Sequence, residues 1–347
     1  MNKLRIGNRI IGDGYKPFII AEIGINHEGD FSKAKTMIKD AYESGAECVK
    51  FQMHIIEDEM TKSAKNVIPG NADESIWEIM DRCSLTKEEH VKLKEYVEEL
   101  GMIYLCTPFS RAAVDVLEEM KVLAYKIGSG ECNNYPLIEH ISSFGRPVIL
   151  STGMNNIESI LKSVDILEKY GIEYSLLHCT SMYPTPYDKV RLGGIDDLRT
   201  NFPNAILGLS DHSLGNYTAF AAVALGAAII EKHFTSNKAW SGPDVPISLN
   251  SKELYDLIIG CEAIYQAIGG KKEILQDEKP TIDFAYACVV AIDDIKEGEK
   301  LSKENIWVKR PGTGEIKAKD FNNLLGKQVN QDISRDIQLE WSMIKDD

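Results

Sequence analysis

Short apolar runs alternate with longer amphipathic segments through residues 1–270. Apolar positions three and four residues apart predict helices, and short apolar runs bounded by glycine or polar residues predict buried strands. Because seven of the eight predicted strands are followed by a predicted helix, the alternation is typical of a parallel sheet with crossover helices. The predicted strands are 18–24, 48–52, 102–106, 124–127, 147–150, 174–178, 205–209 and 227–230, and the predicted helices are 32–44, 87–100, 111–120, 136–144, 157–170, 217–225 and 251–268.

Eight strands that alternate with helices in this length predict a (β/α)8 barrel, a TIM barrel, with a doubly wound sheet as the alternative. The positions of the polar residues favour the barrel, because every predicted strand ends in a group that can bind or react, and a barrel collects these ends on one face. The strand-end residues are Glu22, Lys50, Thr107, Lys126, Ser151, Thr180, His212 and His233.

Three segments depart from the alternation. Residues 4–11 are compatible with a small hairpin that turns at 12–14, and 53–85 lack a clean period, which predicts a long loop over a site. Beyond Gly270 the period changes to short β-like runs, which predict a small β-rich module. We therefore expect a barrel domain at 1–270, a linker at 271–284 and a second domain at 285–347.

Composition excludes several classes of function. The chain has 347 residues with 39 basic and 53 acidic side chains, a formal net charge of −14, which argues against nucleic acid and anionic membranes as partners. No apolar run approaches the roughly 20 residues that span a bilayer, and the first residues lack the apolar core of a signal peptide. Seven scattered cysteines without C-x-x-C spacing favour free thiols in a reducing compartment. We expect a cytoplasmic protein.

Two histidines end successive predicted strands, and each has a carboxylate nearby. His212 follows Asp211, and His233 lies two residues after Glu231. A single histidine at a strand end is more often a hydrogen-bonded structural residue than a ligand, but two at equivalent ends of neighbouring strands point into one pocket. We interpret His212 and His233 as ligands of a divalent metal ion.

The other strand ends suit a phosphate-bearing anion. Lys50 and Lys126 are two cations, and hydroxyl groups near glycines accompany them, at Thr107, Ser129, Ser151 and Ser210; charge-assisted hydrogen bonds to such an anion are strong. Glu22 is either a buried structural carboxylate or a general acid–base. The chain has no G-x-G-x-x-G or P-loop motif, which disfavours nucleotide binding, and no G-x-S-x-G elbow.

From end to end the chain resembles the bacterial sialic acid synthases. The motifs that carry the resemblance are Ala21-Glu-Ile-Gly-Ile-Asn-His27, Val67-Ile-Pro-Gly-Asn-Ala72, Thr107-Pro-Phe-Ser-Arg111, Lys126-Ile-Gly-Ser-Gly-Glu131, Ser151-Thr-Gly-Met154, His178-Cys-Thr180, Tyr183-Pro-Thr-Pro186, Gly208-Leu-Ser-Asp-His212 and Glu231-Lys-His-Phe-Thr235. The run Trp307-Val-Lys-Arg-Pro-Gly312 looks like the antifreeze-like SAF domain that follows the barrel in this family.

The resemblance implies an enzyme, a transferase that condenses phosphoenolpyruvate with an open-chain N-acylated hexosamine to a nine-carbon 2-keto acid and phosphate. It implies Mn²⁺ on His212 and His233, with Mg²⁺ or Co²⁺ as alternatives, and Glu22 as the carboxylate that handles a proton. Phosphoenolpyruvate would contact Lys50, Thr107, Lys126, Ser129, Ser151 and Ser210. The sugar would contact Gln52, Asn71, Glu131, Tyr183, Asp244 and Arg310. Arg310 would reach the pocket of the other subunit, which implies a domain-swapped homodimer.

Three departures from the family pattern leave the acceptor sugar open. Ser181 stands where the most similar sialic acid synthases carry Asn, the loop 236–241 lacks the usual Asp and Arg, and Asp244 is followed by Val-Pro-Ile-Ser. Trp240 is either a surface anchor or a wall for a bulkier sugar. N-acetylmannosamine is the expected acceptor. A 2,4-diacetamido-trideoxy hexose, giving a legionaminic-type acid, is the alternative, and a hexosamine 6-phosphate is less favoured because no further basic cluster is present.

Two other classes of function remain open at this stage. One is a non-catalytic protein that binds a carbohydrate or an anion. Such a protein does not need a metal site combined with an acid–base residue, so the presence of Glu22, both lysines and both histidines argues against it. A metal-dependent aldolase on the same barrel is separated from a synthase by phosphate release that depends on phosphoenolpyruvate.

Overall fold

The computed structural model describes residues 2–70 and 72–345. The chain divides into two compact units, Met1–Gly269 and Gly270–Asp347, which we describe one after the other. Among the described residues, no helix is both long enough and apolar enough to cross a membrane.

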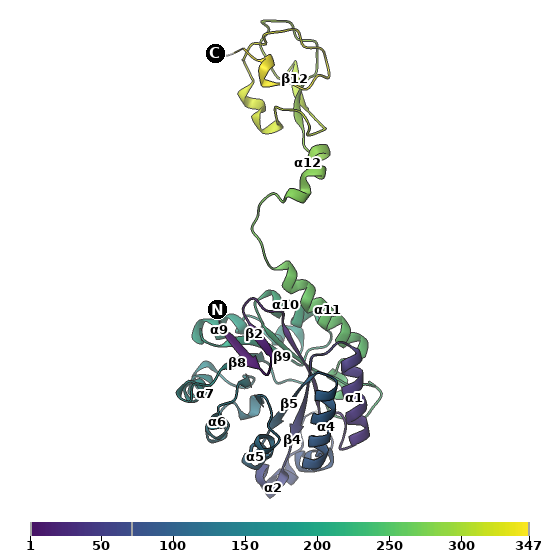
Figure 1. The fold of residues 1–347 in the computed structure, drawn as a ribbon, viewed down its shortest axis with the longest axis vertical. Helices are drawn as coiled ribbons and strands as arrows, with labels where there is room; N and C mark the ends of the chain where they lie inside the picture. The colour runs from purple at the N-terminus through teal and green to yellow at the C-terminus, as the bar shows by residue number, and fades with distance from the viewer. Residues whose placement is uncertain (1, 71, 346–347) are drawn as a thin grey trace. The chain divides into compact units, whose positions relative to one another are not determined.

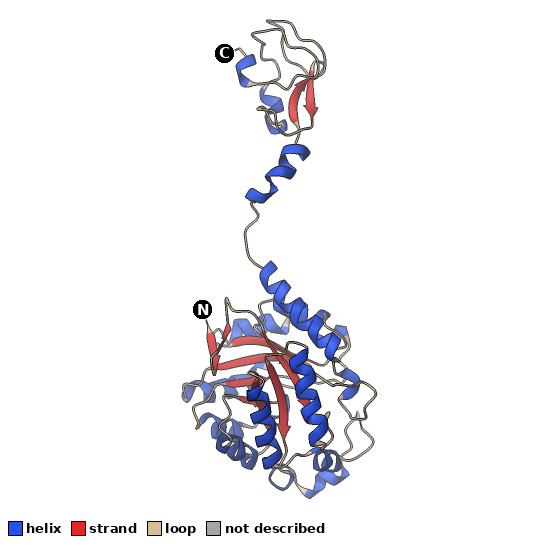
Figure 2. Ribbon diagram, turned by 45° about the vertical axis from the view of Figure 1, so that its right-hand side comes forward, coloured by secondary structure: helices blue, strands red, loops and turns tan. Residues whose placement is uncertain are grey.

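The first unit is a barrel of parallel strands surrounded by helices (Figures 1 and 2). The ladder order is β5-β4-β3-β10-β9-β8-β7-β6, so the last strand pairs with the first, and β5 and β6, the two ends of the ladder, also pack together. This order confirms the predicted barrel over a doubly wound sheet. The strands are β3 Phe18–Gly24, β4 Cys48–Met53, β5 Ile103–Pro108, β6 Tyr125–Ile127, β7 Val148–Ser151, β8 Tyr174–Cys179, β9 Ile206–Asp211 and β10 Ile229–His233.

The helices around the barrel bury one apolar face each against the strands. In α1, for example, Ala34, Met37, Ile38 and Ala41 are buried, while the Asp30 side chain accepts hydrogen bonds from the first turn. Such spacing and capping explain why the sequence predicted these helices well. The helices are α1 Phe31–Glu43, α2 Ile56–Glu59, α3 Ile76–Cys83, α4 Lys87–Glu99, α5 Arg111–Glu119, α6 Tyr135–Ser142, α7 Ile157–Lys169, α8 Tyr187–Val190, α9 Gly194–Asn201, α10 Tyr217–Ala224 and α11 Ser251–Ala267; the 3₁₀ helices are η1 Lys62–Asn66, η2 Ser129–Glu131 and η3 Val245–Ile247.

Two predictions need correction. The segment 53–85 is not a structureless loop, because it contains α2, η1 and α3; these elements are too short to show a period in the sequence. The N-terminal hairpin pairs β1 Lys3–Ile6 with β2 Arg9–Gly12 and turns at positions 7–8 rather than 12–14. Gly7 takes a positive φ of 56°, which suits a two-residue hairpin turn.

The hairpin closes the amino-terminal end of the barrel. Leu4, Ile6 and Ile11 are fully buried and pack against inward-facing strand residues such as Phe18 and Ile229. A larger apolar core lies between the strands and the helices. Since one end of the barrel is filled with apolar side chains, polar side chains can gather only at the carboxyl ends of the strands.

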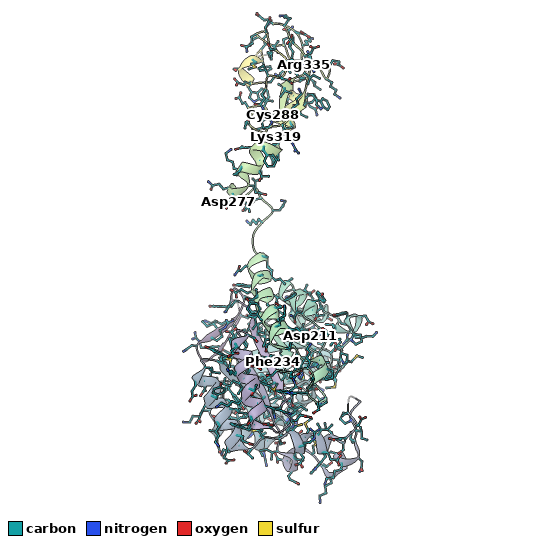
Figure 3. All side chains as sticks on the ribbon, turned by 90° about the vertical axis from the view of Figure 1, so that its right-hand side faces the viewer. Asp211, Phe234, Asp277, Cys288, Lys319 and Arg335 are labelled. Atoms are coloured by element: carbon teal, nitrogen blue, oxygen red, sulfur yellow. The ribbon has the colours of Figure 1, made fainter. Side chains whose placement is uncertain are left out.

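The second unit has its own small core. Strands β11 Cys288–Ala291 and β12 Ile306–Lys309 pair antiparallel, and buried residues such as Val289, Ile306 and Leu339 pack around them. Figure 3 labels Cys288 of β11 and Lys319 of the 3₁₀ helix η5 in this unit. The expected linker 271–284 contains the 3₁₀ helix η4 Gln276–Glu278 and most of helix α12 Lys279–Ala285. The remaining 3₁₀ helices are η5 Ala318–Asn323 and η6 Trp341–Met343.

Candidate active site

A cavity of about 260 Å³ lies at the carboxyl ends of the barrel strands. Every strand of the barrel, or the residues directly after it, contributes to its lining. Most residues that the sequence analysis singled out are therefore brought together. The lining residues are Glu22, Lys50, Gln52, Thr107, Phe109, Lys126, Gly128, Ser129, Gly130, Ser151, Met154, Ser181, Tyr183, Ser210, His212, Glu231 and His233.

The two lysines are buried and held by hydroxyl groups. Lys50 Nζ donates to Thr107 Oγ1 at 3.0 Å, and Lys126 Nζ donates to Ser151 Oγ at 2.8 Å. Ser129 Oγ lies beside them and accepts from the backbone N–H of Gly153 at 3.0 Å. This half of the cavity presents two cations and several hydroxyls, which suits an anion with several oxygens.

Glu231, which sequence analysis did not assign to the site, lies between the two lysines. Its carboxylate is 3.8 Å from Lys50 Nζ and 3.6 Å from Lys126 Nζ, and Ser210 Oγ donates to it at 3.1 Å. Burial by itself lowers the pKa of both lysines. For Lys50 the effect of Glu22 and Glu231 is larger and the pKa is raised, whereas for Lys126 burial prevails and the pKa is lowered.

The two carboxylates of the cavity differ in acidity. Glu22 Oε2 is 2.7 Å from Lys50 Nζ, and Glu22 Oε1 accepts from Gln52 Nε2 at 2.9 Å. Burial raises the pKa of Glu22, and the negative charge of Glu231 adds to this while Lys50 opposes it. For Glu231 burial is outweighed by Lys126 and Lys50, which lower its pKa. The arrangement therefore suits Glu22 to take up a proton and Glu231 to stay ionised.

His212 and His233 face each other across the cavity, with ring centroids 5.5 Å apart. His212 Nδ1 lies 3.1 Å from the carbonyl oxygen of Thr180, which leaves Nε2 for a ligand bond. His233 Nδ1 is buried without a hydrogen-bond partner and lies 3.7 Å from Asp244 Oδ2. Burial lowers the pKa of His233 to about 4, so its ring is neutral, as metal ligation requires.

The two histidines fit a divalent metal ion whose remaining ligands are mostly oxygen atoms of the substrate and of water. In the described parts of the chain, no three His, Cys, Asp or Glu side chains are grouped as a metal site. Two imidazoles, of which that of His233 has an unpartnered buried nitrogen, can hold an ion such as Mn²⁺ if substrate and water complete its coordination.

The residues expected to contact the sugar are only partly gathered. Gln52 and Tyr183 line the cavity, and the Tyr183 ring packs on His212 at 4.1 Å between centroids. Asp244 is next to His233, as given above, but Glu131 is half-buried in η2 and accepts from Asn134 Nδ2 at 2.5 Å. Asn71 lies outside the described residues. Arg310 belongs to the second unit, where it is exposed after the end of β12.

Three further positions are settled by the structure. Ser181 lines the cavity and lies close to Gly153. A Cβ atom added to Gly153 would collide with the hydroxyl groups of Ser181 and Ser129. Trp240 is not among the lining residues; it packs on the barrel core, with Lys33 Nζ 5.3 Å from its ring centroid. Thr180 directly follows the end of β8, as expected, but it is not among the lining residues, and its hydroxyl donates to the carbonyl of Lys189.

Comparisons with known proteins agree with the fold. The NeuB family model matches residues 37–273, and the SAF domain model matches residues 286–345. An uncharacterised protein from Methanocaldococcus jannaschii is 39% identical, covering 98% of both chains, and an N,N'-diacetyllegionaminic acid synthase from Campylobacter jejuni is 37% identical, covering 92% of this chain and 98% of its own. The crystal structure of an N-acetylneuraminic acid synthetase from Leptospira borgpetersenii, in complex with citrate, has a TM-score of 0.74 at 33% identity, covering 81% of this chain and 95% of its own.

Proposed function

The chain belongs to the NeuB family, whose synthases are phosphoenolpyruvate-dependent condensing enzymes, and from this premise we propose its reaction and the residues that perform it. The enzyme condenses phosphoenolpyruvate with the aldehyde of an open-chain N-acylated hexosamine. The products are a nine-carbon 2-keto acid and inorganic phosphate. The observation that carries this proposal is the cavity at the carboxyl ends of the strands, in which two lysines with hydroxyls face two histidines.

Phosphoenolpyruvate binds on the lysine side. Lys50 and Lys126 pair with its phosphate and carboxylate, and Thr107, Ser129, Ser151 and Ser210 donate hydrogen bonds to the remaining oxygens. Glu231 keeps both lysines directed into the cavity before the anion arrives. Each charge-assisted hydrogen bond contributes on the order of 1.5–3 kcal/mol, not additively.

The acceptor aldehyde binds on the histidine side. His212 and His233 would hold a divalent ion, Mn²⁺ in our proposal, which when bound would polarise the aldehyde carbonyl and stabilise the negative charge that develops on its oxygen. The chain's own residues orient the sugar: Gln52, Tyr183 and Asp244 line or border this side, and Asn71, Glu131 and Arg310 are further expected contacts. Glu22, between Lys50 and Gln52, holds or releases a proton near the reacting carbons.

We propose N-acetylmannosamine as the first acceptor and a 2,4-diacetamido-trideoxy hexose as the second. The second is supported by one observation: Ser181 lines the cavity and is smaller than the Asn of the most similar sialic acid synthases, and in our proposal the smaller side chain admits a second acylamino group. A hexosamine 6-phosphate is not favoured, since the lining that the structure describes has no lysine or arginine besides Lys50 and Lys126.

The assembly and the compartment are part of the proposal. The expected dimer would place the partner subunit's Arg310 at the N-acyl group of the sugar, and the exposed position of Arg310 after β12 is compatible with this. All seven cysteines are free and buried, which supports a reducing compartment such as the cytoplasm.

The test is phosphate release from phosphoenolpyruvate with Mn²⁺, comparing N-acetylmannosamine with 2,4-diacetamido-2,4,6-trideoxymannose. Release that depends on either sugar supports the synthase, and the faster sugar identifies the acceptor. Ser181→Asn should then shift the preference toward N-acetylmannosamine. No release with either sugar would contradict the proposal and favour the aldolase or the binding protein.

A further inference from the structure

A chain of hydrogen bonds leads from helix α2 to the candidate acid–base residue. Glu59 Oε2 in α2 is 2.8 Å from His54 Nδ1, and His54 Nε2 is 3.2 Å from Gln52 Oε1. Gln52 Nε2 in turn donates to Glu22 Oε1 at 2.9 Å. His54 and Glu59 are not part of the cavity lining, and neither has a role in the reaction described above.

While the Glu22 carboxyl is ionised, the donors and acceptors in this chain fit in only one way. An ionised Glu22 carboxyl accepts at both oxygens, at Oε2 from Lys50 Nζ, which can only donate, and at Oε1 from Gln52. The NH₂ group of Gln52 must therefore face Glu22, and its oxygen must face His54. Because the Gln52 oxygen and the Glu59 carboxylate are both acceptors, the His54 ring must donate from both nitrogens.

From this arrangement we propose that His54, held by Glu59, is a positioning residue for the acceptor side of the cavity. A ring that donates from both nitrogens binds only the oxygen end of the Gln52 amide. The NH₂ end is then held on Glu22, in the orientation in which Gln52 also faces the sugar. This inference rests on the proposed function, since it concerns how Gln52 and Glu22 are presented to the acceptor.

The surroundings hold His54 in place. Its side chain is 2% exposed, and its ring stacks on Phe109, a lining residue, with centroids 4.5 Å apart and planes 15° apart. Helix α2 is fixed to α5, because the Ala112 N–H donates to Asp58 Oδ2 at 2.8 Å. The position of Glu59 is therefore set by the fold and not by the ligand.

Several other charged groups act on this chain of contacts. His27 and His90 lie near enough to His54 for mutual repulsion of their protonated forms, and Glu131 lies near enough to Glu59 to interact with it. At the other end, Lys50 and Glu231 face Glu22. Of these groups, only Glu59 contacts the His54 ring with a negative charge, so Glu59 is the residue to change.

The experiment uses the full-length enzyme and compares Glu59→Gln with Glu57→Gln, an exposed residue of the same helix. Glu59→Gln keeps the shape but removes the charge that favours a doubly protonated ring. With a ring that donates from one nitrogen, the Gln52 amide can turn over and present its oxygen to Glu22. We expect the KM for the acceptor sugar to rise about tenfold, the effect of losing one well-placed hydrogen bond, while the KM for phosphoenolpyruvate stays within about twofold.

A second readout does not depend on activity. In nitrogen-15 spectra of the histidine rings, the His54 signal is identified as the one that is absent from the His54→Gln variant. In the wild-type protein at neutral pH, this signal should show that both ring nitrogens are protonated. Glu59→Gln should change that signal to a neutral ring, and Glu57→Gln should leave it unchanged. A neutral His54 in the wild-type protein would overturn the inference, and so would an equal rise of both KM values in Glu59→Gln. If the wild-type protein releases no phosphate with either sugar, the proposed function fails while these spectra still decide the state of His54.

Discussion

Asp211 and Lys232 form an ion pair that is completely enclosed between strands β9 and β10 and helix α10. Lys232 Nζ is 2.7 Å from Asp211 Oδ2, and the two side chains are 0% and 1% exposed. They are register partners, and each directly precedes one of the two cavity histidines. Thr218 of α10 donates to the same carboxylate, so the pair lies on the helix side of the strands. Because neighbouring residues of a strand point to opposite faces, His212 and His233 point into the barrel.

This pair should be important for stability. Lys232→Met leaves the buried Asp211 carboxylate without its counter-charge, and removing one partner of a buried pair costs about 3–5 kcal/mol. We expect a correspondingly lower free energy of unfolding in urea. The matched control is Lys252→Met, which breaks the exposed pair with Asp256 and should leave the unfolding midpoint unchanged. Equal effects of the two substitutions would contradict this reading of the buried pair.

Replacing either cavity histidine should remove metal binding. His212→Ala and His233→Ala each delete one of the two imidazole ligands, so we expect Mn²⁺ affinity, followed by electron paramagnetic resonance, to fall by at least about 100-fold, as losses in metal sites commonly do. Phosphate release should fall with it. His140→Ala, which changes a partly exposed histidine paired with Asp115, is the control and should bind Mn²⁺ normally. Retained Mn²⁺ affinity in both cavity variants would place the metal elsewhere.

Lys126 should act mainly on phosphoenolpyruvate. Lys126→Met removes a buried cation that pairs with Ser151 and lies near Glu231, and one lost charge-assisted hydrogen bond corresponds to a KM that is about 10- to 100-fold higher. The KM for the sugar should change much less. Steady-state kinetics with each substrate varied in turn measures both values. Lys162→Met on the exposed face of α7 should change neither, and a larger effect on the sugar than on phosphoenolpyruvate would refute the assignment.

Stability should decrease in mild acid. Burial lowers the pKa of His27 to about 4 and that of His90 to about 3, whereas in the unfolded chain both take up a proton near pH 6.5. The unfolded state therefore binds more protons below that pH, and the stabilisation present above pH 6.5 is lost as the pH falls toward 4, by about 1.4 kcal/mol per pH unit for each histidine.

Urea unfolding at several pH values between 7 and 4.5 measures this slope. His90→Leu should reduce it by the contribution of about one proton, even if the variant is less stable at pH 7 because it loses the contact with the Tyr104 hydroxyl. An unchanged slope in His90→Leu would show that His90 is not neutral in the folded protein.

The barrel could be predicted because its signals are local. Apolar spacing defines the helices, and the strand ends that carry Lys50 or His212 are visible as the points where an apolar run stops. The small elements between 53 and 85 were missed, since a helix of one or two turns has no detectable period. The hairpin turn was misplaced because Gly7 and the glycines at 12 and 14 are equally good turn residues in the sequence.

Within the site, the sequence identified the lysines, hydroxyls and histidines but not what each of them contacts. Glu231 and Glu22 are both carboxylates near the end of a strand, and their different acidity appears only when the distances to Lys50 and Lys126 are known. The sequence left open whether Trp240 lies at the surface or forms a wall of the sugar site. It assigned no role to His54, because the partners of His54 are decided by the fold.

By itself, then, the sequence determined the order of the elements, the barrel and which side chains stand at its carboxyl ends, because periodicity and strand ends are properties of neighbouring residues. Only the tertiary structure decided which charges neutralise one another, which nitrogen of His233 is left without a partner and how Glu59 reaches Gln52 through His54. These properties depend on burial and on distances between residues from different strands, and neither is written in the local pattern of the chain.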